Sequence, residues 1–225
     1  MTGDLMTTSS PALVRRRISD AVYDALLDAV VSGRLAAGTK IKDRDLCAEL
    51  RVSRTPVREA LQRMEDAGLI DIASGQHTEV TGTDRAQVEV ITLLASQTCA
   101  LAAERAIGTM TAKDFESLER ETAAAAWALS AGNTAELIRA SIAFYTVFVD
   151  ASGNPVLSRT FGRLWPHVAR EITCDSAWRY PPDLVQRRQE IASAAQSGDG
   201  RRTADLIRAA GQDLAARVAS RARAS

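Results

Sequence analysis

The sequence has few of the residues that build metal or catalytic sites, because its 225 residues include three cysteines and two histidines. Cys47, Cys99 and Cys174 are far apart and form neither a CxxC pair nor a zinc-ligand spacing, so we expect reduced thiols in a cytoplasmic protein. Neither a nucleophile–base constellation nor a pattern of paired carboxylates is present. The chain is therefore not predicted to be an enzyme.

A net charge and a membrane segment are also lacking. The 28 Lys and Arg residues balance the 28 Asp and Glu residues, which excludes a general attraction of the whole chain for nucleic acid. No segment approaches the length of a membrane span, and Met1 to Pro11 lacks the apolar core of a signal peptide. Any nucleic-acid contact must come from a local basic cluster, and one such cluster comprises Arg51, Arg54, Arg58 and Arg63, opposed by Glu59.

That cluster lies in the stretch RVSRTPVREALQRMEDAG, residues 51–68, which predicts an amphipathic helix. Ser53 or Thr55 can cap its N-terminus, Pro56 is tolerated only in a first turn, and Gly68 ends it. The apolar positions at helical spacing are Val57, Ala60, Leu61, Met64 and Ala67, which leaves Arg54, Thr55, Arg58 and Gln62 on the other side. Guanidinium and hydroxyl groups at a helix N-terminus suit phosphates and guanine edges. The alternative is an ordinary helix with a solvated basic face.

The flanking segments favour DNA binding. Asp43 to Leu50 predicts a short helix with Leu46, Cys47 and Leu50 facing inward, joined to the next helix by a short turn. After that helix, Leu69 to Ile72 and His77 to Val80 alternate as strands around a turn at Ser74–Gly75–Gln76. This order predicts a winged helix-turn-helix. The residues expected to contact DNA are Arg44, Ser53, Arg54, Thr55, Arg58, Gly75, Gln76 and His77.

The rest of the chain divides into an N-terminal arm and a helical domain. We expect a disordered arm at 1–14, a DNA-binding domain at 15–82 and an all-helical domain at 83–225, with Thr83 or Asp84 capping its first helix. Ile18 to Ser32 predicts a supporting helix, and Arg15 to Arg17 is either a phosphate contact or a solvated basic arm. Turn signals separate six helical segments at about 84–107, 111–131, 134–152, 155–174, 182–197 and 200–222. The fold class is thus mainly α, with a small β hairpin and an antiparallel six-helix bundle.

The run VVSGRLAAGTKIKDRDLCAELRVSRTPVREALQRMEDAGLI closely resembles the winged helix-turn-helix of GntR-family transcription regulators. Three later stretches resemble the FadR-type effector domain called FCD, and six helices point to its shorter, VanR-like group. The stretches are Leu94 to Ala106, Phe144 to Leu157 with its SGNP sequence, and Ile191 to Arg208 with its GD turn. The resemblance implies a homodimer that binds a palindromic operator, usually as a repressor released by an effector.

In most proteins with the FadR-type effector domain, an Asp and three His hold a divalent metal, and the metal helps to bind a carboxylate effector. Those positions fall on Ser141, Tyr145, Arg188 and Ala210 in this chain, and a frequent Arg and Glu of the first helix fall on Ile91 and Ala95. His77 belongs to the predicted wing, and His167 is alone. We therefore expect no metal and no cofactor.

A pocket for an organic ligand is still predicted in the helical domain. Ser141, Tyr145 and Arg188 are its candidate effector-binding residues, with Arg188 anchoring an amphipathic acid or an acyl ligand. Its apolar wall would comprise Ile91, Leu94, Phe144, Phe148 and Trp165. In the alternative, Arg188 faces solvent, the interior is simply packed, and the domain serves dimerisation or protein contacts without sensing a small molecule. Trp178 to Pro182 is predicted to be a connecting loop, with a lid as the alternative.

Overall fold

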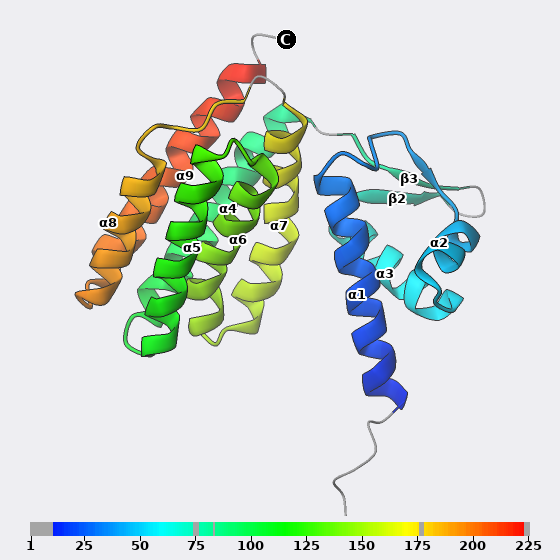
Figure 1. The fold of residues 1–225 in the computed structure, drawn as a ribbon, viewed down its shortest axis with the longest axis horizontal. Coiled ribbons are helices and arrows are strands. Elements are labelled where there is room, and N and C mark those ends of the chain that lie inside the picture. The colour runs from blue at the N-terminus through cyan, green and yellow to red at the C-terminus, as the bar shows by residue number, and fades with distance from the viewer. Residues whose placement is uncertain (1–10, 74–76, 83, 176–177, 223–225) are drawn as a thin grey trace, which may run out of the picture. The chain divides into compact units, whose positions relative to one another are not determined.

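The computed structural model describes residues 11–73, 77–82, 84–175 and 178–222. Contacts between residues divide the chain into two compact units, Met1–Gly82 and Thr83–Ser225. The first unit contains α1 (Pro11–Val31), β1 (Lys40–Ile41), α2 (Asp43–Leu50), α3 (Arg54–Asp66), β2 (Ile70–Ala73) and β3 (His77–Val80). The second contains α4 (Arg85–Ala106), α5 (Ala112–Ser130), α6 (Thr134–Ala151), α7 (Pro155–Cys174), α8 (Leu184–Gln196) and α9 (Gly200–Ala222), as Figure 1 shows.

The first unit is a winged helix-turn-helix, as predicted. Its antiparallel sheet has the strand order β1-β3-β2, with Ile70 opposite Val80 and Ile41 opposite Thr78. The fully apolar side of α3 packs against α1 and β2. The core comprises Val22, Leu26, Val30, Ile41, Val57, Ala60, Leu61, Met64, Ala67, Leu69, Ile70 and Val80. This burial of apolar area fixes which side of α3 faces outward.

The boundaries of the first helix differ from the prediction. α1 begins at Pro11, whereas the sequence predicted a disordered arm at 1–14 and a helix from Ile18. Residues 11–14 are therefore helical, because a proline is favoured at a first helical position and Ala, Leu and Arg follow as good helix formers. The rest of the predicted arm lies outside the described residues.

The second unit is a bundle of helices, and the N-termini of α4, α5, α6 and α7 are capped by the residues before them. Asp84 accepts a hydrogen bond from the Ala86 amide at 3.0 Å, and Asn133 and Asn154 cap α6 and α7 in the same way. Thr111 forms a reciprocal capping box with Asp114 at the start of α5. These side chains satisfy amides that have no partner within the helix, which explains why the predicted helix boundaries are close to the observed ones.

The helix α4 lies against α6, α7 and α9 in this bundle. Its contact with α9 is so close that a Cβ atom on Gly211 would lie 2.1 Å from the Cβ atom of Ser96, so this position requires glycine. Residues Ala86–Ala106 are long and apolar enough to cross a membrane, by length and composition alone. The expectation that no segment approaches that length was therefore wrong. The helix α4 is apolar because it packs against three neighbouring helices, and a helix surrounded by apolar neighbours needs apolar side chains as a membrane helix does.

Candidate nucleic-acid interface and effector cavity

A three-residue turn, Arg51 to Ser53, joins α2 to α3. Arg51 has a left-handed backbone with φ 54°, and its amide donates to the carbonyl of Cys47. Leu46 and Cys47 pack half-buried against the core and hold α2 in place. A left-handed residue other than glycine is uncommon and costs free energy, so the core contacts of α2 must stabilise this turn.

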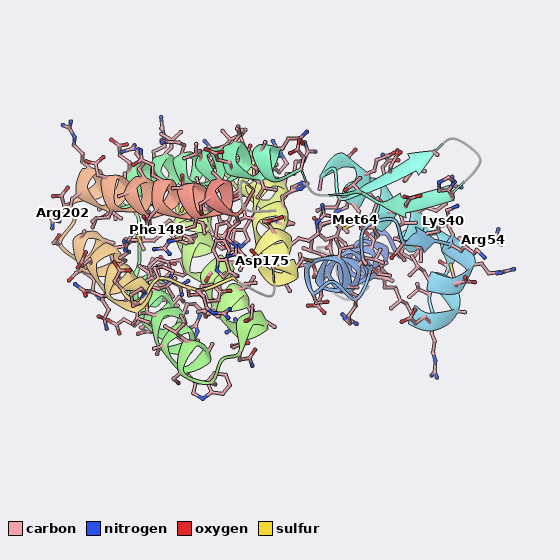
Figure 2. All side chains as sticks on the ribbon, turned by 90° about the horizontal axis from the view of Figure 1, so that it is seen from above. Lys40, Arg54, Met64, Phe148, Asp175 and Arg202 are labelled. Atoms are coloured by element: carbon pink, nitrogen blue, oxygen red, sulfur yellow. The ribbon has the colours of Figure 1, made fainter. Side chains whose placement is uncertain are left out.

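The N-terminus of α3 presents the predicted DNA-binding residues to solvent. Ser53, Arg54, Thr55 and Arg58 are all exposed, and neither Arg54 nor Arg58 forms an ion pair within the described part of the chain. Figure 2 shows Arg54 at the outer edge of this unit and Met64 in its interior. Ser53 is the N-cap, with φ −73° and ψ 168°, but its hydroxyl makes no capping hydrogen bond. Both the N-terminal amides and the two guanidinium groups are therefore available to phosphates or base edges.

Two other arginines of the predicted basic cluster are less available. The Nη1 atom of Arg63 lies 2.7 Å from Oδ1 of Asp20, and its guanidinium carbon lies 4.1 Å from the centre of the Tyr23 ring. Arg63 therefore joins α3 to α1. Arg44 is exposed on α2, where its Nε atom lies 3.2 Å from Oδ1 of its neighbour Asp45. Such an exposed pair is weak and can exchange for a phosphate.

A groove of about 560 Å³ is lined by residues of α3 and of the sheet. Arg58 and Gln62 line it on one side, and Lys40, Lys42 and His77 line the other. His77 Nε2 lies 3.2 Å from Oε2 of Glu79. The predicted wing residues Gly75 and Gln76 lie outside the described residues. The two lysines were missed, although both flank the buried Ile41 in extended backbone, where alternation places them on the side opposite Ile41.

The three predicted effector residues, Ser141, Tyr145 and Arg188, line one cavity of about 80 Å³ in the helical unit. The other residues around it are Ile138, Trp165, Ala169, Ile172, Trp178, Tyr180, Pro181, Leu184, Arg187, Ala210, Asp213, Leu214 and Arg217. Arg187, Arg217 and Asp213 were not predicted. Asp213, Leu214 and Arg217 follow Ala210 at helical spacing on α9, which is the signal that would have identified them.

Arg188 is buried, with 3% of its surface exposed, so the alternative in which it faces solvent was wrong. It donates a hydrogen bond to the Ser141 hydroxyl, and its guanidinium carbon lies 5.4 Å from the centre of the Phe144 ring. No carboxylate lies within ion-pair distance of Arg188 among the residues that the structure describes. Burial accordingly lowers the pKa of its guanidinium, partly offset by Tyr145, Tyr180 and Glu121.

The apolar wall differs from the prediction. Trp165 lines the cavity, but Phe144 and Phe148 are fully buried in the core, Leu94 is 50% exposed, and Ile91 is not among the lining residues. The connection between α7 and α8 contributes Trp178, Tyr180 and Pro181 to the wall, so it is more than a plain loop. Trp178 is buried and its amide donates to the carbonyl of Asp175 at 2.9 Å, which holds the segment against the bundle.

The positions at which the resemblance places metal ligands converge on this cavity, because Ala210 lines it together with Ser141, Tyr145 and Arg188. Their donor set does not fit a divalent cation: a serine hydroxyl and a neutral phenol are poor ligands, arginine does not deprotonate, and alanine has no donor atom. Burial raises the pKa of the Tyr145 phenol further, which keeps it protonated. Among the described residues no group of three His, Cys, Asp or Glu is placed to hold a metal.

Two family descriptions match the chain, one for each unit. Residues 18–80 match "Bacterial regulatory proteins, gntR family" and residues 100–213 match the FCD domain. The chain is 25% identical over 198 residues to a "Probable D-xylose utilization operon transcriptional repressor" of Paenarthrobacter nicotinovorans, covering 86% of this chain and 85% of that protein. It is 23% identical over 196 residues to the HTH-type transcriptional repressor RspR of Escherichia coli, covering 87% and 86%.

Solved structures agree at the level of the fold. The structure of E. coli McbR/YncC superimposes with a TM-score of 0.79 at 20% identity, covering 91% of this chain and 98% of that one. A GntR regulator from Rhodococcus sp. RHA1 superimposes with a TM-score of 0.71 at 18% identity, covering 90% and 97%. The arrangement of α2, α3 and the sheet, followed by the helical bundle, is the arrangement of these proteins. The chain belongs to the GntR family of bacterial regulatory proteins and carries an FCD domain, and it is a DNA-binding transcriptional regulator rather than an enzyme.

Proposed function

We propose that this regulator is a homodimeric, cytoplasmic repressor that binds a palindromic operator. The observation that carries the DNA contact is the pair of exposed arginines, Arg54 and Arg58, without ion-pair partners at the N-terminus of α3. Thr55 and Ser53 lie beside them, and Lys40, Lys42 and His77 line the neighbouring groove. Guanidinium groups can bind guanine edges in a major groove, while lysines bind phosphates. Gly75 and Gln76 complete the proposed wing contact.

Free thiols at Cys47, Cys99 and Cys174 are compatible with a reducing cytoplasm.

A stripe of apolar residues on α4 supports self-association. Val90, Leu94 and Leu101 are 63%, 50% and 42% exposed, although side chains of this kind are usually covered. Together with Gln97 they follow intervals of four, three and four residues, which is the spacing of a helix-to-helix contact. A second copy of the chain would cover this stripe by presenting the same stripe in the opposite direction.

The helical domain would bind a small acidic or amphipathic metabolite that modulates DNA binding. Support comes from the single cavity that Ser141, Tyr145 and Arg188 share, with Arg188 as a buried cation that lacks a carboxylate. Such a ligand can release the operator only if it binds the two conformations of the dimer with different affinity. The rival function, a bundle that serves dimerisation or protein contacts alone, does not explain why the Arg188 guanidinium is buried without a carboxylate partner.

Selection of bound fragments from genomic DNA tests the DNA-binding half. Enriched fragments should share a palindrome whose half-sites lie about one DNA turn apart. A shared asymmetric site bound by a monomer would contradict the dimer. Thermal melting against a panel of carboxylic acids and neutral metabolites tests the other half, because an effector raises the melting temperature of the state that it binds. A panel without any effect would favour the rival function.

A further inference from the structure

Unpaired polar atoms gather around one cavity of the helical unit. In the described part of the chain, buried side-chain atoms without a hydrogen-bond partner occur on Glu121 and on five residues that all line this cavity. The five atoms are Nε1 of Trp165, Nε1 of Trp178, the hydroxyl of Tyr180, Nη1 of Arg188 and Nε of Arg217. Buried polar atoms are nearly always paired, so this concentration indicates that a partner is missing from the cavity.

The five atoms share one chemical property, since each can donate a hydrogen bond. Indole and guanidinium nitrogens only donate. Burial raises the pKa of the Tyr180 phenol, which therefore stays protonated and donates as well. Two acceptors in the wall are already engaged: the Ser141 hydroxyl accepts from Arg188, and Oδ2 of Asp213 lies 3.0 Å from Nη1 of Arg187. The missing partner must therefore supply several acceptor atoms.

The charge of the wall is also unbalanced. The lining includes three guanidinium groups, on Arg187, Arg188 and Arg217, and the carboxylate of Asp213. Asp183, outside the lining, also pairs with Arg187 at 2.7 Å, so three guanidinium groups face two carboxylates. Asp213 pairs with Arg187 and lies 3.5 Å from Nη2 of Arg217, whereas Arg188 has no carboxylate partner among the described residues. A buried cation without a paired carboxylate is costly. A ligand with one negative charge for Arg188 and a second for Arg217, which shares Asp213 with Arg187, would remove that cost.

The size of the cavity limits the ligand to a compact molecule. A water needs roughly 10–15 Å³ of such space, so a cavity of about 80 Å³ holds on the order of five to eight water-sized groups. A neighbouring chamber of about 30 Å³, between Thr92, Cys99, Phe161 and Ile207, adds room for about two more. A long acyl chain or a nucleotide does not fit, which narrows the acidic or amphipathic class to its small, polar members.

We propose that the cavity binds a compact dianion without a metal ion. Its two negative charges come from two carboxylates or from one phosphoryl group, paired with the guanidinium groups of Arg188 and Arg217. The indoles of Trp165 and Trp178 and the phenol of Tyr180 donate to the remaining acceptor atoms. This inference names the ligand class of the effector site and rests on the proposed function only for the regulatory consequence of binding.

Tryptophan fluorescence of the full-length protein tests this proposal. The variant Trp127→Phe removes the one exposed tryptophan and leaves Trp165 and Trp178, both in the cavity wall, as reporters. Succinate, succinamate and succinamide are matched probes of nearly equal size with two, one and no negative charges, and inorganic phosphate represents the phosphoryl source. At constant ionic strength we expect succinate or phosphate to bind, and each loss of a charge along the succinate series to weaken binding about tenfold or more.

Two arginine variants separate a binding role from a structural one. Arg188→Gln and Arg217→Gln should each weaken binding of the active dianion about tenfold or more. Because Arg188 is a buried cation without a carboxylate, Arg188→Gln should keep or raise the melting temperature of the ligand-free protein. Arg202→Gln, an exposed arginine of α9 that Figure 2 labels, is the matched control and should change neither quantity.

Each outcome decides the proposal. Preference for succinate or for phosphate identifies the source of the charges. Equal binding of succinate, succinamate and succinamide would overturn the dianion while leaving an effector site in place, and so would wild-type affinity in both arginine variants. No response to either succinate or phosphate would also overturn it. Operator binding in a mobility-shift assay is measured separately, so a failure of the DNA-binding function remains distinguishable.

Discussion

Arg58 and Arg63 belong to the same helix, but their side chains have different surroundings. Arg58 lies at the groove beside the sheet, without an ion pair within the described part of the chain. Arg63 lies one and a half turns later, where it contacts Asp20 and the ring of Tyr23 on α1. The buried Val57, Leu61 and Met64 determine the position of each arginine around α3. That position leaves Arg58 free for the proposed DNA contact and places Arg63 against α1.

Arg58→Ala should lower operator affinity by about 1–3 kcal/mol, because a base or phosphate contact is lost. Its melting temperature should stay at the wild-type value. Arg63→Ala is the matched control on the same helix: it loses a half-exposed ion pair and a cation–π contact, which together contribute about 1 kcal/mol to stability. Mobility-shift titration at fixed salt and thermal melting measure both quantities. Wild-type operator affinity of Arg58→Ala would contradict the proposed interface.

The residues of the cavity also predict how the protein responds to chelators. Ser141, Tyr145, Arg188 and Ala210 offer no ligand set for a divalent cation, and Arg188 puts a positive charge where a cation would bind. We expect elemental analysis of the purified protein to give no stoichiometric zinc, nickel or manganese. The melting temperature should be the same with and without EDTA, since a bound metal would have stabilised the fold. One metal per chain in the helical unit would contradict both the arginine anchor and the dianion.

Single residues were predictable where a resemblance or a helical period fixed their place. Ser141, Tyr145 and Arg188 come from α6 and α8, and the alignment that the resemblance supplied grouped these residues, which line one cavity in the structure. Arg217 was missed, since the sequence does not reveal which face of α9 turns inward. Trp178 was assigned to a connecting loop, with a lid as the alternative, because the sequence does not reveal which part of a connection turns inward. Phe144 and Phe148 were assigned to the cavity, but packing in the core uses their whole surface.

At the scale of elements, local signals carried most of the prediction. Capping residues such as Asp84, Asn133 and Asn154 and the breaks at glycines fixed the helices of the bundle. The end of α3 was equally clear, because Gly68 follows it with φ 72°. The start of α1 was predicted at Ile18, whereas the helix begins at Pro11. A proline can stand at the first position of a helix or in the loop before it, and the apolar pattern alone did not decide between these two positions.

The turn between α2 and α3 gives a prediction at this scale. Arg51 has a left-handed backbone, which glycine adopts without a steric penalty. Arg51→Gly should therefore raise the free energy of unfolding by about 0.5–1 kcal/mol, even after the entropy that glycine adds to the unfolded chain. Urea denaturation measures the change, with Arg44→Gly within α2 as a control that should be destabilised. A less stable Arg51→Gly protein would mean that the arginine side chain itself stabilises the turn.

For the whole molecule, recognition of a palindrome requires two copies of α3 held about one DNA turn apart. Leu94 and Leu101 lie on either side of Gln97 in the exposed stripe on α4, so a two-fold axis near Gln97 would place each leucine opposite the other on the second copy. Gln97, between the two leucines, accepts a hydrogen bond from Arg208 of α9, so its amide oxygen already has a partner within the same chain.

The double variant Leu94→Glu/Leu101→Glu should be monomeric, because like charges would face each other across the contact at the place of two buried leucines. Each monomer keeps its own α3, so the loss of operator affinity reports the loss of bivalency, a factor of roughly a hundred or more. Sedimentation and mobility-shift titration measure the two effects. Val156→Glu, an equally exposed apolar position on α7, is the control and should remain dimeric with wild-type affinity. If the double variant stays dimeric, the two copies meet through another surface, and the stripe on α4 must serve a different partner.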